Sequence, residues 1–136
     1  MAAQNGRDML IKIKDDLDSF ITVAGLRTKS LKFNAKTIDV THSESEDAWR
    51  ELLPGSGVKS VEISGEGIFC DSASDALVRA SFFAQTARSY QMILPDFGMI
   101  EGDFLINTLN YTGSYNGEAN YELVLVSAGK SQFTAL

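Results

Sequence analysis

The chain has 136 residues, of which 44% are hydrophobic and 22% charged, an ordinary composition for one domain with a buried core. We therefore expect a single domain over residues 1–136, and no apolar run approaches the roughly 20 residues that a membrane-spanning helix needs. The formal net charge of −6 argues against a protein that grips nucleic acid phosphates with a basic face. The N-terminal residues lack a basic-then-apolar signal pattern, so we expect synthesis in the cytoplasm.

The negative charge is concentrated in the C-terminal half of the chain. Residues 1–59 carry nine acidic and nine basic side chains, whereas residues 60–136 carry nine acidic side chains and only Arg79, Arg88 and Lys130 as bases. No lysine or arginine occurs between Ser89 and Gly129. Such a segment is either a solvated surface that keeps the protein soluble or a surface that must not bind a polyanion.

The N-terminal third alternates between apolar and polar residues, as half-buried β-strands do. In DMLIKIKD, Met9, Ile11 and Ile13 fall on one face and the lysines on the other. SFITVAGL predicts a second short strand that Gly25 closes. The segments KSLKF and KTIDVTH are expected to be strands whose inward candidates are Leu31, Phe33, Ile38 and Val40.

A long loop, about residues 41–57, follows these strands and holds the only tryptophan, in SEDAWRELLPGSG. Loops of this length in a compact domain are usually functional or disordered. Trp49 has two interpretations. It either folds back over its own domain as a lid on the core or contacts another molecule, where a large apolar body with a polar handle gains most from burial.

The next segment, VKSVEISGEGIF, predicts a curved strand. Val61 and Ile63 share one phase of the alternation and Ile68 has the other, so the phase is expected to slip near Gly65 and Gly67 through a bulge or bend.

One segment, about residues 72–87, predicts an α-helix that flanks the sheet. Its small and apolar residues recur at spacings of three and four, and Ser72 with Asp75 resembles a capping box. The expected buried stripe is Ala73, Ala76, Leu77, Ala80, Phe83, Ala84 and Ala87. Val78 and Phe82 lie off this stripe, and a second buried side against another copy of the chain would use them.

The C-terminal part predicts SYQMILP as a strand and then two longer strands that form a hairpin through the turn signal Asn116-Gly117. On the first long strand, Ile100, Phe104 and Ile106 share one phase, whereas Glu101 and Asp103 share the other with Leu105, Asn107, Leu109 and Tyr111. On the second, the phase of Tyr121, Leu123 and Leu125 is opposite to that of Glu118 and Glu122. The fold class is therefore mainly β, an antiparallel barrel or sandwich with one flanking helix.

The sequence offers little for catalysis or for metal binding. His42 is the only histidine and Cys70 the only cysteine, so a multi-histidine metal site and an internal disulfide are both excluded. No nucleotide-binding or nucleophile motif occurs, and paired carboxylates such as Glu101 and Asp103 more simply stay solvated. We expect neither an enzyme nor a cofactor.

Several landmarks together resemble the major tail tube protein family of long-tailed bacteriophages, to which tail tube proteins of bacterial gene transfer agents are similar. These are WRELLPG at residues 49–55, then VKSVEISGEGIF, then a helix beginning DSAS. FGMIEGDFLINTLNYTGSYNGEANYELVLVSAGKSQF, residues 97–133, resembles the family's C-terminal half. The resemblance covers nearly the whole chain, from Gly6 to Phe133.

The resemblance implies a structural subunit whose hexameric rings stack into a hollow tube through which DNA passes. Acidic side chains lining the channel would repel DNA phosphates and let the duplex slide; the candidates are Glu101, Asp103, Glu118 and Glu122. The long loop would contact an adjacent subunit or ring through Glu46, Asp47, Trp49, Arg50, Glu51, Leu52, Leu53 and Pro54. The helix would meet the next subunit at Val78 and Phe82.

The resemblance also implies partners and a location. The chain would bind itself, with the tail terminator, tape measure and distal tail proteins as further partners, in the tail of a virion or virus-like particle assembled in the bacterial cytoplasm. Residues 1–7 and 131–136 are candidate arms that become ordered only on assembly. A secretion-system tube protein and a monomeric β-barrel that binds a ligand under a loop lid are the alternative functions.

Overall fold

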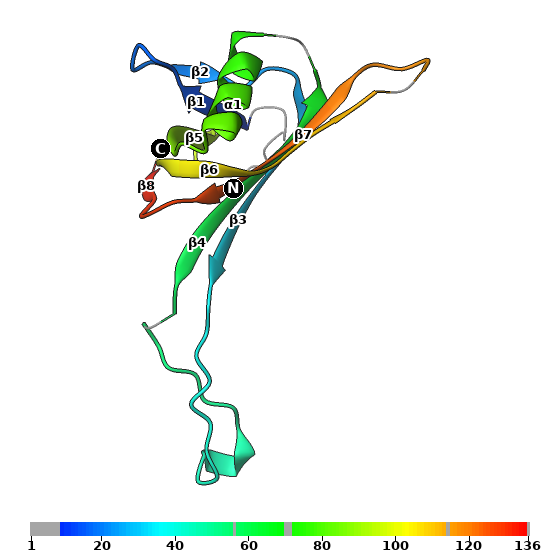
Figure 1. Ribbon diagram of the computed structural model, residues 1–136. Coiled ribbons are helices and arrows are strands. Elements are labelled where there is room, and N and C mark those ends of the chain that lie inside the picture. Colours follow the sequence, from blue (N-terminus) through cyan, green and yellow to red (C-terminus); the bar gives the residue numbers. More distant parts are fainter. Residues whose placement is uncertain (1–8, 56, 70–71, 114, 136) are drawn as a thin grey trace.

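A computed structural model describes residues 9–55, 57–69, 72–113 and 115–135 (Figure 1). In this part of the chain one helix, α1 (Ala73–Ala84), accompanies eight strands. These are β1 (Leu10–Lys14), β2 (Phe20–Thr22), β3 (Leu26–Ala35), β4 (Lys59–Ile68), β5 (Arg88–Leu94), β6 (Gly98–Thr112), β7 (Asn120–Ser127) and β8 (Gln132–Ala135).

The strands form one antiparallel sheet in the order β2-β1-β5-β6-β7-β4-β3, and β8 pairs with the first residues of β6. The mainly β fold with one flanking helix is thereby confirmed. The sheet of the single chain is open rather than closed into a barrel, because β2 and β3 lie at opposite ends of the strand order. The hairpin expected at Asn116-Gly117 joins β6 to β7.

The core lies between α1 and one face of the sheet (Figure 1). Ile11 and Ile13 of β1 are buried there as the alternation predicts, and so are Tyr121, Leu123 and Leu125 of β7. The expected second strand, closed by Gly25 with a positive φ of 78°, is β2. Among the described residues, no element covers the other face of the sheet.

The phase slip expected in β4 is wrong. Val61, Ile63, Gly65 and Gly67 keep one phase, and the pairing of β4 with β7 is continuous from Glu62 to Ile68. The irregularity lies instead in β3, between Leu26 and Thr28. A Cβ on Gly67 would lie 2.0 Å from the backbone oxygen of Gly25, so the glycine allows a close backbone approach rather than a change of phase.

A bulge in β6 corrects a second expectation. The pairing of β6 with β7 shifts between Ile106 and Thr108, so one extra residue moves Leu109 and Tyr111 to the core side of the strand. Leu109 packs against the core, and the Tyr111 ring lies 6.4 Å from that of Tyr121. Leu109 and Tyr111 therefore do not share a face with Glu101 and Asp103.

Helix α1 begins with the expected capping box. The Ser72 N–H and hydroxyl both donate to Asp75 Oδ2, at 3.0 and 3.1 Å. The face that it buries is not the predicted stripe. Ser74, Val78 and Ser81 lie against the sheet, whereas Phe83 is 78% exposed.

Long-range hydrogen bonds explain this orientation of α1. Ser74 Oγ accepts the backbone N–H of Ala24 at 3.0 Å, and Ser81 Oγ accepts Arg88 Nε–H at 3.0 Å. Because these partners satisfy the two hydroxyls, serines lie where the sequence pattern predicts apolar side chains.

The loop between β3 and β4 is longer than predicted, covering residues 36–58, and it projects away from the sheet (Figure 1). Ile38 and Val40 lie in this loop and not in a strand. Backbone hydrogen bonds from Val40 N to Glu51 O, at 2.9 Å, and from Leu53 N to Ile38 O, at 2.8 Å, hold its two arms together. Phe33, near the end of β3, is also exposed, because the strand runs beyond the core.

The two expected arms have different outcomes. Residues 1–7 lie outside the described residues. Residues 132–135 already form β8 on β6 in the single chain, so the idea that residues 131–136 become ordered only on assembly is wrong for these four residues. The pairing gives their backbone groups hydrogen-bond partners before any second copy is present.

Candidate assembly surfaces

The uncovered face of the sheet carries a strip of carboxylates, called the acidic strip here. Its members lie on three neighbouring strands at positions of the same phase, and they are Glu62 and Glu66 of β4, Glu101 and Asp103 of β6, and Glu122 of β7. Each alternates with residues that point into the core, such as Ile63, Phe104 and Leu123. Three of the four acids expected to share a surface are thus brought together.

Local polar contacts hold two carboxylates of the acidic strip, and lysines of the outer strands flank it on the same face. Gln91 Nε2 donates to Glu101 Oε1 at 2.9 Å, and Ser89 Oγ donates to Asp103 Oδ1 at 2.9 Å. On the described parts of β4, β5, β6 and β7, no lysine or arginine shares this face, but Lys32 of β3 lies opposite Glu62 and Lys12 of β1 lies opposite Gln91. The charged side chains on the central strands of this face are therefore all negative, and the lysines lie on the outer strands.

Glu66 and Glu122 are direct cross-strand partners in the pairing of β4 with β7. Like charges in this position repel each other and cost stability. The Glu66–Glu122 pair is therefore either retained because its charge serves a purpose other than fold stability, or tolerated because both side chains are solvated.

Glu118 does not belong to the acidic strip, contrary to expectation. It precedes β7, which begins at Asn120, so the alternation of that strand does not extend to it. Its carboxylate instead forms an ion pair with Arg27, at 3.4 Å. Glu62 and Glu66 lie outside the segment without basic residues and were therefore not predicted; their alternation with Ile63 is the signal that identifies them.

The β3–β4 loop presents apolar side chains to solvent. Trp49 is 74% exposed and lies beside a short 3₁₀ turn over Glu46–Ala48. In the single chain Trp49 is therefore not a lid on the core. Thr41 Oγ1 accepts the Glu51 N–H at 2.8 Å, and Thr41 hydrogen bonds hold the pKa of Asp39 below its ordinary value. These contacts make the loop a defined projection.

The remaining loop candidates share this surface. Leu52 and Leu53 are also exposed, Leu52 forms an isolated bridge with Asp39, and Glu51 lies 3.6 Å from His42 Nε2. Arg50 and Pro54 lie in the exposed part of the same segment. The loop thus brings together the whole set of residues predicted for it.

The helix surface needs one correction. Val78 is 1% exposed and packs in the core, so it cannot meet another subunit. Phe82 is partly exposed, and its ring makes an edge-to-face contact with that of Phe83 at 5.6 Å. The apolar surface of α1 that remains open is therefore the side carrying these two phenylalanines.

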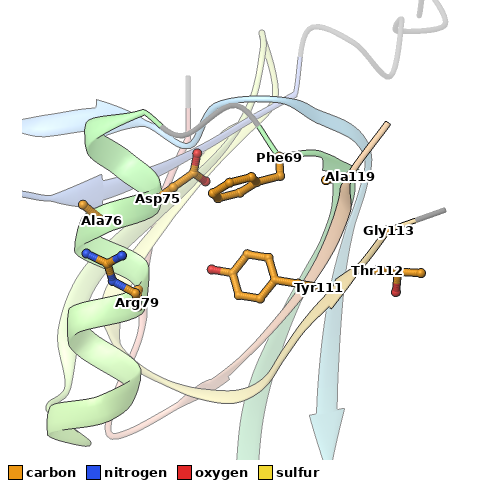
Figure 2. Close-up of a pocket in the computed structure, with 8 residues that line it drawn as sticks. All are labelled: Phe69, Asp75, Ala76, Arg79, Tyr111, Thr112, Gly113 and Ala119. Atoms are coloured by element: carbon orange, nitrogen blue, oxygen red, sulfur yellow. The ribbon is translucent and has the colours of Figure 1, made fainter. Parts of the chain in front are cut away.

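A pocket of about 420 Å³ lies between α1 and the outer end of the β6–β7 hairpin (Figure 2). We call it the end pocket; it is lined by Phe69, Asp75, Ala76, Arg79, Tyr111, Thr112, Gly113 and Ala119. Figure 2 shows the Phe69 and Tyr111 rings between the helix and the hairpin, with the Tyr111 hydroxyl directed toward the helix. Partial burial raises the pKa of Tyr111 above its ordinary value.

The described residues offer neither a metal site nor a membrane-spanning helix. No group of three or more His, Cys, Asp or Glu side chains there could hold a metal ion. No helix in the described part of the chain is long and apolar enough to span a membrane.

Comparisons with known proteins identify the family. The model of the phage tail tube protein family matches residues 3–133. The tail of an empty gene transfer agent particle, determined with C6 symmetry, is 50% identical with a TM-score of 0.93 and covers 98% of this chain and 100% of that chain. The virion of a native gene transfer agent particle gives 52% identity, a TM-score of 0.91 and the same coverage.

A more distant structure shares the fold. The SPP1 tail tube is 16% identical with a TM-score of 0.69, covering 97% of this chain and 79% of that chain. No curated protein matches the sequence. The family match and the two gene transfer agent structures confirm the resemblance seen in the sequence, and the chain therefore belongs to the phage tail tube protein family.

Proposed function

We propose that this tube subunit forms hexameric rings that stack into a hollow tube through which DNA passes. The observation that carries the proposal is the acidic strip on the uncovered face of an open sheet. The similarity to a gene transfer agent tail with C6 symmetry over 98% of the chain supports the ring symmetry.

The sheet edges favour a closed ring. β3 is a ten-residue edge strand and β2 lies at the other end of the strand order, so both present backbone groups that another chain can pair with. In a head-to-tail ring, the edge of one copy meets the edge of the next and none stays free. The open sheet of the single chain thereby becomes part of a continuous inner wall.

The acidic strip then lines the channel. Five carboxylates per copy give thirty in a ring of six, and such a surface repels DNA phosphates. The duplex can move through the tube because the central strands of the channel surface carry no lysine or arginine that would bind a phosphate. The alternative, a merely solubilising acidic surface, does not require the five carboxylates to share one face.

The exposed loop and helix residues are the proposed contacts between copies. Trp49, Leu52 and Leu53 supply apolar anchors in the loop, and Phe82 with Phe83 supplies the border on α1. Large aromatic side chains of this kind contribute most when they are buried at a contact. Residues 1–7 are proposed to become ordered on stacking.

The particle is a phage or gene transfer agent tail, assembled in the bacterial cytoplasm. Tail terminator, tape measure and distal tail proteins are the proposed partners at the ends and inside the tube. The role in the tube is structural, with no catalytic step.

Negative-stain electron microscopy of the purified protein across a concentration series tests the proposal. The wild type is expected to form rings and tubes with an open centre, whereas Trp49→Ala stays folded but stacks poorly. Leu17→Ala, at another exposed apolar residue, is the matched control and should form tubes. A wild type that remains monomeric at every concentration would refute the tube.

A further inference from the structure

We infer that the tip of the β3–β4 loop, residues 44–50, docks through Trp49 into the end pocket of a copy in the next ring. The inference rests on the proposed function, since it requires stacked rings, and it names the surface that receives the loop. The occupant is thus a second copy of this chain.

The positions of loop and pocket in the fold suit head-to-tail stacking. The loop leads into Lys59, the first residue of β4, whereas Phe69 of the end pocket directly follows its last residue, Ile68. The ten residues of β4 separate the two features by roughly 33 Å. Figure 1 shows the loop projecting from one end of the molecule, with α1 and the β6–β7 hairpin toward the other. Copies that stack in the same orientation bring these ends together.

The chemistry of the pocket suits an indole ring. The Phe69 and Tyr111 rings make an edge-to-face contact at 5.4 Å, with an angle of 86° between their planes. The volume of about 420 Å³ lies within the range of pockets that hold small organic ligands. Trp49 is 74% exposed in the single chain, so it has most of its surface available for burial against these rings.

The charges are complementary. Among the described residues, the Arg79 side chain has no ion pair or hydrogen bond, while the other charged group of the pocket, Asp75, is engaged by Ser72. Arg79 is therefore the charge that the pocket offers. On the loop tip, Glu46 and Asp47 form the acidic turn next to Trp49 and have no ion pair with any described residue. The guanidinium can also stack on the indole face.

A second apolar pocket, of about 400 Å³, competes for the same role. It is lined by Phe33 and Phe133 together with Lys59 and Lys130. It lies at the end of β3 and β4 from which the loop itself projects. When copies stack in the same orientation, the loop of one copy reaches the opposite end of the next copy, where the end pocket lies. This geometry favours the end pocket over the second pocket.

Disulfide trapping tests the contact directly while keeping Trp49 and Arg79. In a Cys70→Ser background, Ala48→Cys on the loop tip is combined with Ala76→Cys in the end pocket. We expect assembled tubes to give, on oxidation, a ladder of linked chains that extends beyond six. The companion variant, Ala48→Cys with Lys130→Cys, should give no ladder. A ladder that stops at six, or one formed only with Lys130→Cys, overturns the inference.

A charge exchange provides the second measurement. Arg79→Glu should raise the protein concentration needed for tube formation by about tenfold or more, and Glu46→Lys with Asp47→Lys should restore it. Because Trp49 is the only tryptophan, its fluorescence should shift to the blue in wild-type tubes but not in isolated rings. Tubes that form normally with Arg79→Glu, or without a blue shift, contradict the docking alone. A wild type without rings or tubes removes the proposed function and this inference together.

Discussion

Reversing the charge of Glu66 should change fold stability and DNA transport in opposite directions. Glu66 faces Glu122 across the β4–β7 pair, so Glu66→Lys replaces a repulsive cross-strand pair with an attractive one. Such pairs contribute roughly 0.2–1 kcal/mol each. We expect Glu66→Lys to raise the free energy of unfolding by about 0.5–1 kcal/mol, measured by urea denaturation of the monomer.

The effect on the channel follows from the charge count. Glu66→Lys with Glu122→Lys changes the acidic strip from five negative charges to three negative and two positive, so a ring of six goes from −30 to −6 and gains twelve lysines. Each phosphate that a lysine neutralises adds about 0.9 to the slope of log K against log salt concentration. If half of the new lysines reach phosphates, DNA binding should show a slope of about −5.

Co-sedimentation of double-stranded DNA with assembled tubes measures this binding. Wild-type tubes should leave the DNA in the supernatant, and the double lysine variant should retain it at low salt and release it at high salt. Asp16→Lys is a control for net charge, because Asp16 lies in the β1–β2 turn and outside the acidic strip. If Asp16→Lys tubes retain DNA equally, or the double variant retains none, the strip does not line the channel.

Three further predictions test the fold. Val78→Ala should cost about 2 kcal/mol by thermal or urea unfolding because Val78 is fully buried, whereas Phe83→Ala should cost little; equal losses would contradict the orientation of α1. Gly67→Ala should destabilise by about 1–3 kcal/mol because its Cβ would overlap Gly25 O, and an unchanged unfolding midpoint would refute the close approach. Burial raises the pKa of Tyr90 well above its ordinary value, so the unfolded chain loses this proton first and stability should fall above about pH 10, by roughly 1.4 kcal/mol per pH unit. Tyr90→Phe should remove that part of the alkaline loss, and identical wild-type and variant profiles would argue against the burial.

The family could be predicted from landmarks spread over nearly the whole chain, whereas the strand content and the hairpin could be predicted from local patterns. Alternation identified Ile11 and Ile13 as inward residues, and Asn116-Gly117 identified the β6–β7 turn. The capping box at Ser72 also follows from residues three apart in the chain. The alternation, the turn and the capping box each depend on residues close together in the chain, so a single sequence contains the necessary information.

Three of the five carboxylates of the acidic strip could be predicted in the same way. The membership of Glu62 and Glu66 and the exclusion of Glu118 could not. Alternation groups Glu101 with Asp103 on one strand, but only the sheet order brings β4 beside β7 and adds Glu62 and Glu66. Glu118 looked equivalent to Glu122 because the start of β7 cannot be read from the sequence to within two residues.

The orientation of α1 and the bulge in β6 were decided by tertiary structure. Periodicity shows which residues share a helix face, but the buried face contains Ser74 and Ser81 because distant partners, Ala24 and Arg88, satisfy their hydroxyls. The exposure of Trp49 could not be predicted from the sequence either. It depends on how far the β3–β4 loop, whose arms are joined by backbone hydrogen bonds, projects from the sheet. The sequence by itself determined the elements and the family, and long-range hydrogen bonds and pairing register decided which side of each element faces another molecule.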